Sequence, residues 1–413
     1  MSDRNRLRIA VRKLDAFERA LDKQSAEFRR LEKNDLNLEI IPYNIWDLHS
    51  ALFDNEGLKR GEFDIAFIVS DWIAEAVAGQ HVVDLQPFLK ISPPDDYPQG
   101  WDDSLLRYQS YENKVYGLPY HNGQKCLIYR KDLFNDPREQ ADFKNRFGNE
   151  LRVPQTWDAF TQVARFFNRP EDALTGIVFL ASQDGYNTIC DFCLHLWSRG
   201  GRLFDVNENI RLNHPQVEET LNFYRNILND SAVMNTNTRM LDAVESGMMF
   251  AKGEAAMMVN WFSCAAQCET LHDSKVKGKV GVSHLPKEKL PHGFTLNVYW
   301  VLGIAEGSDN KDLAYRFIRH CVSKKMDRLL TLEGGNGSRL STWQDERLNK
   351  LIPFYRELEA LQKDAYDMPR HPEWTKLATI IDDMMREAIA TDRSVTDIVR
   401  DGQYRAESIL KID

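Results

Sequence analysis

Polar and aromatic side chains recur where the first predicted strands of the chain end. The clusters are Arg-Lys-Leu-Asp at residues 12–15, Tyr-Asn-Ile-Trp-Asp at 43–47 and Ser-Asp-Trp at 70–72. Carboxylate, amide and guanidinium groups form hydrogen bonds with polar groups of a ligand, and an indole ring offers an apolar face. These residue types suit the non-covalent binding of a small ligand. The candidate ligand contacts here are Arg12, Lys13, Asp15, Trp46, Asp47, Asp71 and Trp72.

The three aspartates also have a purely structural interpretation. Asp is a favoured helix N-cap, and Asp15, Asp47 and Asp71 each stand where a helix is expected to begin. Capping alone stays open for any one of them. Recurrence of the same chemistry at three strand ends favours a shared site.

Similar groups occur later in the chain. The stretch GLPYHNGQKCLIYRKDLF, residues 117–134, places His-Asn-Gly directly before a strand that must be buried. A strand at Ala255–Asn260 ends in an Asn-Trp pair, and the loop LEGGNGSRLS, 332–341, offers backbone donors that close over a ligand or else form a helix C-cap and turn. The candidate contacts from these segments are Tyr120, His121, Asn122, Asn260, Trp261, Asn336 and Arg339, and Trp300 in the stretch LNVYWVLGIA is a further candidate.

The elements that must position these residues begin with a parallel sheet. Strands are predicted at 6–11, at 36–43 and at Ile65–Val69, with helices between and after them. A β-α-β-α-β order calls for parallel strands with right-handed crossovers. Ligands bind beyond the carboxyl ends of such strands, which is where the polar clusters lie.

A second sheet is expected further along. A strand is predicted at Gly176–Leu180, and amphipathic helices are predicted at Tyr186–Ser198 and Pro215–Asn229. Thr156 is a plausible N-cap for the helix that starts at Trp157.

Length and charge limit the classes of protein. With 413 residues the chain exceeds the ~150 typical of one domain, so two lobes are expected. Acidic residues number 62 against 53 basic ones, a net charge of −9, and no basic stripe suits nucleic acid. No apolar run reaches the ~20 residues that cross a bilayer. The start MSDRNRLRIAV shows no targeting segment, which fits a cytosolic protein or a replaced export signal.

The six cysteines include two close pairs, Cys190 with Cys193 and Cys264 with Cys268. On helices each pair shares a face, so packing in the core, disulfide formation and zinc binding all remain open. Packing is favoured, because both segments have the pattern of amphipathic helices rather than zinc knuckles.

From Gly117 onward the order of motifs resembles the extracellular solute-binding proteins of bacterial ABC importers, the carbohydrate-binding group of the maltose-binding-protein type. The motifs are DIAFIVSDW, YGLPYHNGQKCLIYRKDLF, PQTWDAF, RGGRLFD, FAKGEAAMMVNW, KVGVSHLPK and EGSDNKDLAYRFIRHCVS. Together with the strand-helix opening they span nearly the whole chain in family order, and the ordered set is more specific than any one motif.

This resemblance implies an α/β, two-lobed periplasmic-binding-protein fold of type II, in which each lobe is a mostly parallel sheet flanked by helices. Hinge crossovers are expected at Tyr120–Gln124, at Val259–Phe262 and near Asp309. The implied N-terminal lobe comprises 1–120 and 262–309, and the implied C-terminal lobe 121–261 and 310–413. The ligand would be clamped between the lobes, with His121, Asn122 and Gly123 beneath it.

The resemblance also implies what the protein does and where. It implies a non-catalytic monomer without cofactor or metal, located in the periplasm, that binds a carbohydrate or derivative and delivers it to ABC permease subunits. Arg12 and Lys13 depart from a neutral-sugar site and allow an acidic, phosphorylated or sulfonated ligand.

Three other classes stay open. A glycoside hydrolase needs two carboxyl groups in reach of one bond, and no such pair or other catalytic motif is evident in the sequence. A polyamine-binding protein of the same fold would use Asp15, Asp47 and Asp71, although Arg12 and Lys13 argue against a cation. A stand-alone sensor is the third class, and neighbouring permease genes would distinguish it from transport.

Overall fold

The computed structural model describes residues 5–179, 185–235, 237–238 and 241–410. The chain divides into two compact units, each built from separate stretches of sequence. Unit 1 comprises Met1–Gly123, Val298–Lys350 and Arg370–Trp374. Unit 2 comprises Gln124–Asn297, Leu351–Pro369 and Thr375–Asp413.

The sheet of unit 1 has the strand order β2-β1-β3-β12-β6. Strand β1 pairs in parallel with β2 and β3, and β12 runs antiparallel to both β3 and β6. A separate hairpin joins β4 to β5. The strands are β1 (Arg6–Arg12), β2 (Asn37–Tyr43), β3 (Ile65–Val69), β4 (Ser110–Tyr111), β5 (Lys114–Val115), β6 (Leu118–His121) and β12 (Trp300–Ile304).

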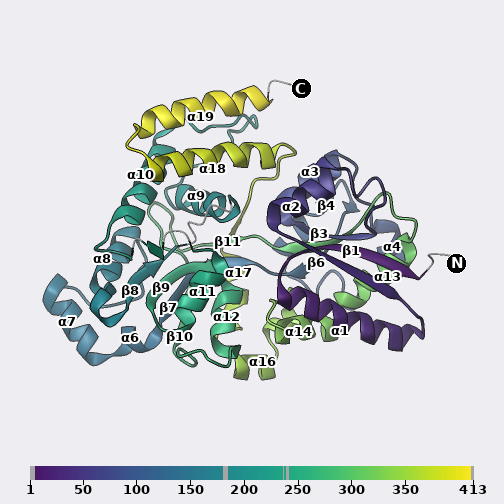
Figure 1. Cartoon of the computed structure of the whole chain (residues 1–413), viewed down its shortest axis with the longest axis horizontal. Helices are drawn as coiled ribbons and strands as arrows, with labels where there is room; N and C mark the ends of the chain where they lie inside the picture. The colour runs from purple at the N-terminus through teal and green to yellow at the C-terminus, as the bar shows by residue number, and fades with distance from the viewer. Residues whose placement is uncertain (1–4, 180–184, 236, 239–240, 411–413) are drawn as a thin grey trace. The chain divides into compact units, whose positions relative to one another are not determined.

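Helices cover both faces of this sheet (Figure 1), with α1, α13 and α14 on one face and α2 and α3 on the other. Helix α1 buries an apolar stripe that includes Phe17, Leu21 and Phe28, while its charged residues face solvent. The helices of unit 1 are α1 (Asp15–Glu32), α2 (Ile45–His49), α3 (Ile73–Ala78), α4 (Gln86–Ile91), α5 (Ser104–Arg107), α13 (Lys311–Cys321), α14 (Lys324–Leu332) and α15 (Leu340–Trp343), with a π turn η1 (Ser50–Asp54) and a 3₁₀ turn η2 (Ser70–Trp72).

The sheet of unit 2 has the order β13-β11-β7-β9-β8, and β10 also pairs with β7. Strand β7 is antiparallel to its neighbours β9, β10 and β11, whereas β8 runs parallel to β9 and β13 parallel to β11. The strands are β7 (Gln124–Arg130), β8 (Thr175–Val178), β9 (Ala255–Trp261), β10 (Val280–Ser283), β11 (Thr295–Asn297) and β13 (Ala365–Asp367).

Helices also flank this sheet (Figure 1), with α9, α10 and α18 to one side and α11, α12 and α17 to the other. The helices are α6 (Lys131–Asn135), α7 (Pro137–Phe147), α8 (Trp157–Phe167), α9 (Tyr186–Ser198), α10 (Pro215–Asn229), α11 (Ala243–Ala251), α12 (Phe262–Thr270), α17 (Glu357–Lys363) and α19 (Val395–Leu410), with a 3₁₀ turn η3 (Pro170–Asp172). Helices α16 (Glu346–Leu351) and α18 (Trp374–Ala390) each begin in unit 1 and continue into unit 2.

Several predicted elements are confirmed within a residue or two. Helices α9 and α10 have the predicted bounds, and the Thr156 hydroxyl caps α8 by accepting the Ala159 amide at 3.2 Å. The predicted strand Gly176–Leu180 is observed as β8, and Leu180 lies outside the described residues. The α/β class with two sheet-containing lobes is also confirmed.

The predicted crossovers and domain boundaries differ from the observed units. The chain does leave unit 1 near the predicted first crossover, after Gly123, but it returns only after Asn297. Residues 262–297 stay in unit 2 because β10 and β11 both pair with β7. Residues 310–350 belong to unit 1, where α13 and α14 pack against α1.

Gly123 has a steric role at this first crossover. A Cβ atom there would lie 2.1 Å from the carbonyl oxygen of Val298, so only glycine allows the two backbones to approach so closely.

The six cysteines lie in the interior of the two units. All six are buried, as the packing interpretation expects. Among the described residues, no group of three or more His, Cys, Asp or Glu side chains is arranged to hold a metal ion. No helix in the described part of the chain is long and apolar enough to cross a membrane.

Candidate functional site

In unit 1, the predicted polar clusters come together at one edge of the sheet. Strands β1, β2 and β3 are adjacent and parallel, so their carboxyl ends share this edge. Trp300 joins them from the start of β12, where it is opposite Val69 and His121. We call this the unit 1 edge. It contains Arg12, Trp46, Asp71, Trp72, His121 and Trp300.

Aromatic rings at the unit 1 edge form a connected series. The Trp72 ring is 6.0 Å from Trp300 and 5.1 Å from His49, and His49 is 6.3 Å from Trp46. Trp72 is only 1% exposed, whereas Trp46 and Trp300 are half-buried. Trp72 is thus a core residue, and the ring surface available at this edge comes from Trp46 and Trp300.

The loop after α14 joins this edge through hydrogen bonds with the end of β6. The Asn336 amide N–H donates to Nδ1 of His121 at 2.9 Å, and the Asn122 N–H donates to the Asn336 carbonyl at 2.9 Å. Burial lowers the pKa of His121 to about 3, so its ring is neutral with the proton on Nε2. The side-chain amide of Asn336 is fully buried, and neither its oxygen nor its nitrogen has a partner among the described residues.

Arg339 and Tyr120, also predicted ligand contacts, serve the core of unit 1. The guanidinium of Arg339 is fully buried, donates to the carbonyl of Val322 at 2.9 Å and lies 4.2 Å over the Trp101 ring. The Tyr120 hydroxyl donates to Gln24 at 3.0 Å. Both groups are therefore engaged in holding the unit together.

The charged candidates of unit 1 differ in exposure. Lys13, Asp15 and Asp47 are exposed, and Arg12 is half-buried. Asp71 is buried and accepts the indole N–H of Trp374 at 3.2 Å. None of the three aspartates occupies an N-cap, because Leu14, Asn44 and Val69 hold those positions.

In unit 2, Asn260 and Trp261 lie at the carboxyl end of β9, beside the start of β7. The Asn260 side chain is fully buried, donates to the Ala243 carbonyl at 3.0 Å and accepts the Trp261 backbone N–H at 2.7 Å. The Trp261 ring is half-buried, and its N–H donates to Asn187 Oδ1 at 3.1 Å. Asn260 therefore braces the strand end, and Trp261 retains exposed ring surface.

Helix α9 supplies a line of buried polar groups behind Trp261. Asn187, Asp191, His195 and Arg199 follow at four-residue spacing, which places them on one side of the helix, and all four are buried. The Asp191 carboxylate accepts from the Tyr224 hydroxyl at 2.7 Å and from the ammonium of Lys125. Burial, with Arg199 and Lys125 nearby, lowers the pKa of His195 well below its usual value, so this ring is neutral.

The end of β11 adds a further polar pair in unit 2. Asn297 donates to the Asp367 carboxylate at 2.7 Å, where β11 and β13 end side by side. We call the group Lys125, Asn187, Trp261, Asn297 and Asp367 the unit 2 edge. Its two amides and the Lys125 ammonium are buried, whereas the Trp261 ring and the Asp367 carboxylate are half-buried and keep surface for stacking and hydrogen bonding.

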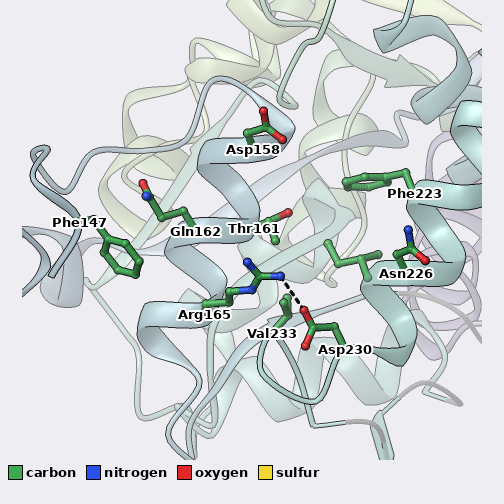
Figure 2. Close-up of a pocket in the computed structure, with 10 residues that line it drawn as sticks. Phe147, Asp158, Thr161, Gln162, Arg165, Phe223, Asn226, Asp230 and Val233 are labelled. Carbon is green, nitrogen blue, oxygen red and sulfur yellow. Dashed lines mark hydrogen bonds and ion pairs between the residues drawn. The ribbon is translucent and has the colours of Figure 1, made fainter.

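A groove of about 460 Å³ lies elsewhere on unit 2. Figure 2 shows it between α8 and α10, with Arg165 bonded to Asp230 at its centre and Phe147 at its margin. Its lining shares no residue with the unit 2 edge. An ion pair between exposed Arg165 and half-buried Asp230, with scattered aromatics, does not form a converging set of donors, so the groove is the weaker candidate site.

Of the unit 2 edge, the sequence patterns indicated only Trp261. They did not indicate Lys125, Asn187, Asn297 and Asp367, or Asp191 next to them. The missed signal was the repeat of Asn, Asp, His and Arg every four residues in a segment otherwise rich in apolar side chains. Lys125 gave no signal of its own, since its place opposite Trp261 depends on the pairing of β7 with β9.

Comparison with known proteins gives a family match. The family model described as bacterial extracellular solute-binding protein matches residues 24–334. This confirms the resemblance drawn from the ordered motifs.

Two curated relatives illustrate the range of this similarity. The probable amino-acid ABC transporter periplasmic-binding protein y4oP of Sinorhizobium fredii is 24% identical over 77% of this chain and 68% of its own length. The mannitol-binding protein of Pseudomonas aeruginosa is 26% identical over 68% of this chain and 62% of its own length.

Solved structures share the fold at low sequence identity. A solute-binding protein of an ABC transporter from Agrobacterium radiobacter K84, in complex with ribitol, has a TM-score of 0.86 at 22% identity, covering 98% of each chain. Maltose-bound MalE3 of T. maritima has a TM-score of 0.84 at 21% identity, covering 98% of this chain and 99% of its own. These likenesses confirm the two-lobed α/β architecture.

Proposed function

We propose, from the premise that this chain belongs to the bacterial extracellular solute-binding proteins, that it binds a sugar or polyol and passes it to an ABC importer. Membership of a solute-binding family confirms a binding protein rather than an enzyme. The ligand class, the permease partners, the monomeric state and the periplasmic location are parts of the proposal. A relative named for mannitol and a neighbour in complex with ribitol support a polyhydroxy ligand.

The observation that carries the proposal is the state of Trp261. Its ring is partly exposed at the end of a strand, and the hydrogen bond from its N–H to Asn187 fixes the orientation of the ring. A fixed indole supplies a stacking surface for the C–H face of a sugar or polyol. The Asp367 carboxylate of the same edge is half-buried and oriented by the amide of Asn297, and it supplies a hydrogen-bonding group for hydroxyls.

A ligand screen tests this proposal. Calorimetry and thermal unfolding are measured with D-mannitol, ribitol, maltose, lactose, sugar acids and amino acids. A true ligand at 100 times its Kd stabilises the fold by about 2.7 kcal/mol. Sugar acids are included because Arg12 and Lys13 lie at the unit 1 edge, and amino acids because one relative is named for them.

Variants then locate the site. Trp261→Ala is expected to weaken binding by roughly 1 to 3 kcal/mol, because a central ring contact is lost. Phe147→Ala is the matched control, since Phe147 is also a half-buried aromatic of unit 2 but lines the groove of Figure 2. Weakening by Phe147→Ala alone would move the site to the groove, and failure of every polyhydroxy compound to bind would refute the proposed ligand class.

Delivery to an importer needs its own test. Deleting the gene should abolish uptake of the identified solute by the cell, and genes for permease subunits are expected nearby. Unchanged uptake would argue against the transport role while leaving solute binding intact.

A further inference from the structure

A buried lysine lies against the ring that is proposed to contact ligand. Lys125 and Trp261 are direct partners across the β7–β9 pair, so their side chains leave the same face of the sheet. The ammonium of Lys125 lies over the Trp261 ring, 5.4 Å from the ring centroid. This is within the ~6 Å at which a cation is attracted to an aromatic face.

Lys125 is held in this place by α9. Its side chain is fully buried and its ammonium bonds to Asp191, which is itself fully buried and accepts from Tyr224. Asn187, which accepts the Trp261 indole N–H, lies four residues before Asp191 on the same side of the helix. Helix α9 therefore contacts Trp261 in two ways. Asn187 accepts a hydrogen bond from the edge of the ring, and Asp191 holds the Lys125 ammonium over the face of the ring.

We propose that Lys125 positions Trp261 and makes this edge select neutral polyhydroxy solutes over cationic ones. The proposal rests on the proposed function and specifies its ligand class. A ring that already attracts one cation gains less from a second, and the positive end of the Lys125–Asp191 pair is the end that lies at the ring. The C–H face of a neutral sugar carries no charge, so it does not compete with the Lys125 ammonium for the ring. The polyamine alternative is thereby disfavoured by unit 2 as well as by Arg12 and Lys13.

The test compares each neutral compound with its amino analogue in the full-length protein. The pairs are D-mannitol with 1-amino-1-deoxy-D-mannitol, and D-galactose with 6-amino-6-deoxy-D-galactose, with Kd measured by calorimetry at neutral pH. The wild type is expected to bind the amine at least tenfold more weakly than its neutral partner. Equal affinities in the wild type would overturn the proposal.

The principal variant is Lys125→Met/Asp191→Asn, which removes both charges and leaves none buried without a partner. The ratio of the two Kd values is expected to fall to within about threefold, because the ring then accepts the amine. Arg130→Met/Asp132→Asn is the matched control, because it removes an ion pair from the opposite end of β7. The control should keep the wild-type ratio.

A second variant keeps the result interpretable if the double variant folds poorly. Trp261→Leu removes the aromatic face and leaves Lys125 paired with Asp191, so both affinities should fall while the amine remains the weaker ligand. A wild-type ratio in the folded double variant, or equal affinities in Trp261→Leu, would show that the Lys125–Asp191 pair only stabilises the core. Absence of binding by all neutral compounds would instead refute the proposed function, so the two failures are distinguishable.

Discussion

The two units each place a tryptophan and an asparagine near the end of a strand, yet they use them in opposite ways. In unit 2 the amide of Asn260 is fully engaged in hydrogen bonds, and the Trp261 ring keeps exposed surface. In unit 1 the Trp72 ring is buried in the core, and the side-chain amide of Asn336 has no partner among the described residues. Tryptophan is structural in unit 1 and a candidate for binding in unit 2, whereas asparagine is structural in unit 2 and a candidate for binding in unit 1.

The difference comes from what surrounds each residue. Trp72 follows β3, a central strand, and lies in a turn whose three residues are all buried, between the rings of His49 and Trp300. Trp261 is the last residue of β9 and contacts Asn187 through one hydrogen bond at its edge and Lys125 over its face. Residue type therefore does not identify a contact surface unless the packing around it is known.

The largest expected effect comes from exchanging the two rings for alanine. Trp72→Ala should lower the free energy of unfolding by roughly 3 to 5 kcal/mol, because it leaves a large cavity in a packed core. Trp261→Ala should cost only about 1 to 2 kcal/mol, since a half-buried ring and one hydrogen bond are lost. Urea unfolding of both variants measures this difference, and equal losses would contradict the comparison.

Replacement of Asn260 in unit 2 is expected to give the next largest loss of stability. Asn260→Ala removes the bonds to Ala243, to Ser246 and to the Trp261 backbone, and it leaves buried groups without partners. The free energy of unfolding should fall by about 2 to 3 kcal/mol. A loss below ~1 kcal/mol in urea unfolding, within what one hydrogen bond supplies, would show that this amide is not structural.

Protonation provides a third measurement, on His121 of unit 1. Its pKa is about 3 in the folded protein, because burial disfavours the charged ring, and about 6.5 in the unfolded chain. Between these values only the unfolded chain takes up the proton, so stability is full above pH 6.5 and falls as the pH drops towards 3. By pH 5, proton uptake by His121 in the unfolded chain should lower the free energy of unfolding by roughly 2 kcal/mol.

His121→Asn isolates this contribution, because its Oδ1 still offers an acceptor to the Asn336 N–H. The variant should lose about 2 kcal/mol less than wild type between pH 6.5 and 5 in urea unfolding. His195 acts in the same direction in both proteins, since its pKa is also lowered by burial. Identical pH profiles would mean that His121 takes up its proton without unfolding.

The smallest effect on stability is expected at Asn336. Asn336→Ala should change the free energy of unfolding by less than about 1 kcal/mol, because no side-chain hydrogen bond among the described residues is lost. If the amide contacts ligand, the same variant should weaken binding more than it weakens the fold. If Asn336→Ala lowered the free energy of unfolding as much as Asn260→Ala does, the proposed contrast between the two asparagines would be contradicted.

Sequence alone determined much about this protein. The alternation of strand and helix predicted the parallel sheet of β1, β2 and β3, and therefore that residues after those strands share one edge. Periodicity placed α10 correctly, because an apolar face at helical spacing is a local property. Helix α9 also has its predicted bounds, but all of its residues are buried, so it is not the amphipathic helix that was predicted. The order of motifs along the chain was enough to indicate the family.

Only the tertiary structure decided which residues belong to which unit and which of them retain exposed surface. The chain stays in unit 2 beyond the crossover predicted at Val259–Phe262, because β10 and β11, later in sequence, pair with β7, a contact that no local pattern encodes. The burial of Trp72, the engagement of Asn260 and the approach of Lys125 to Trp261 depend likewise on partners distant in sequence. Residue types state which chemistry is available, whereas long-range packing decides which groups are satisfied internally and which remain to bind a solute.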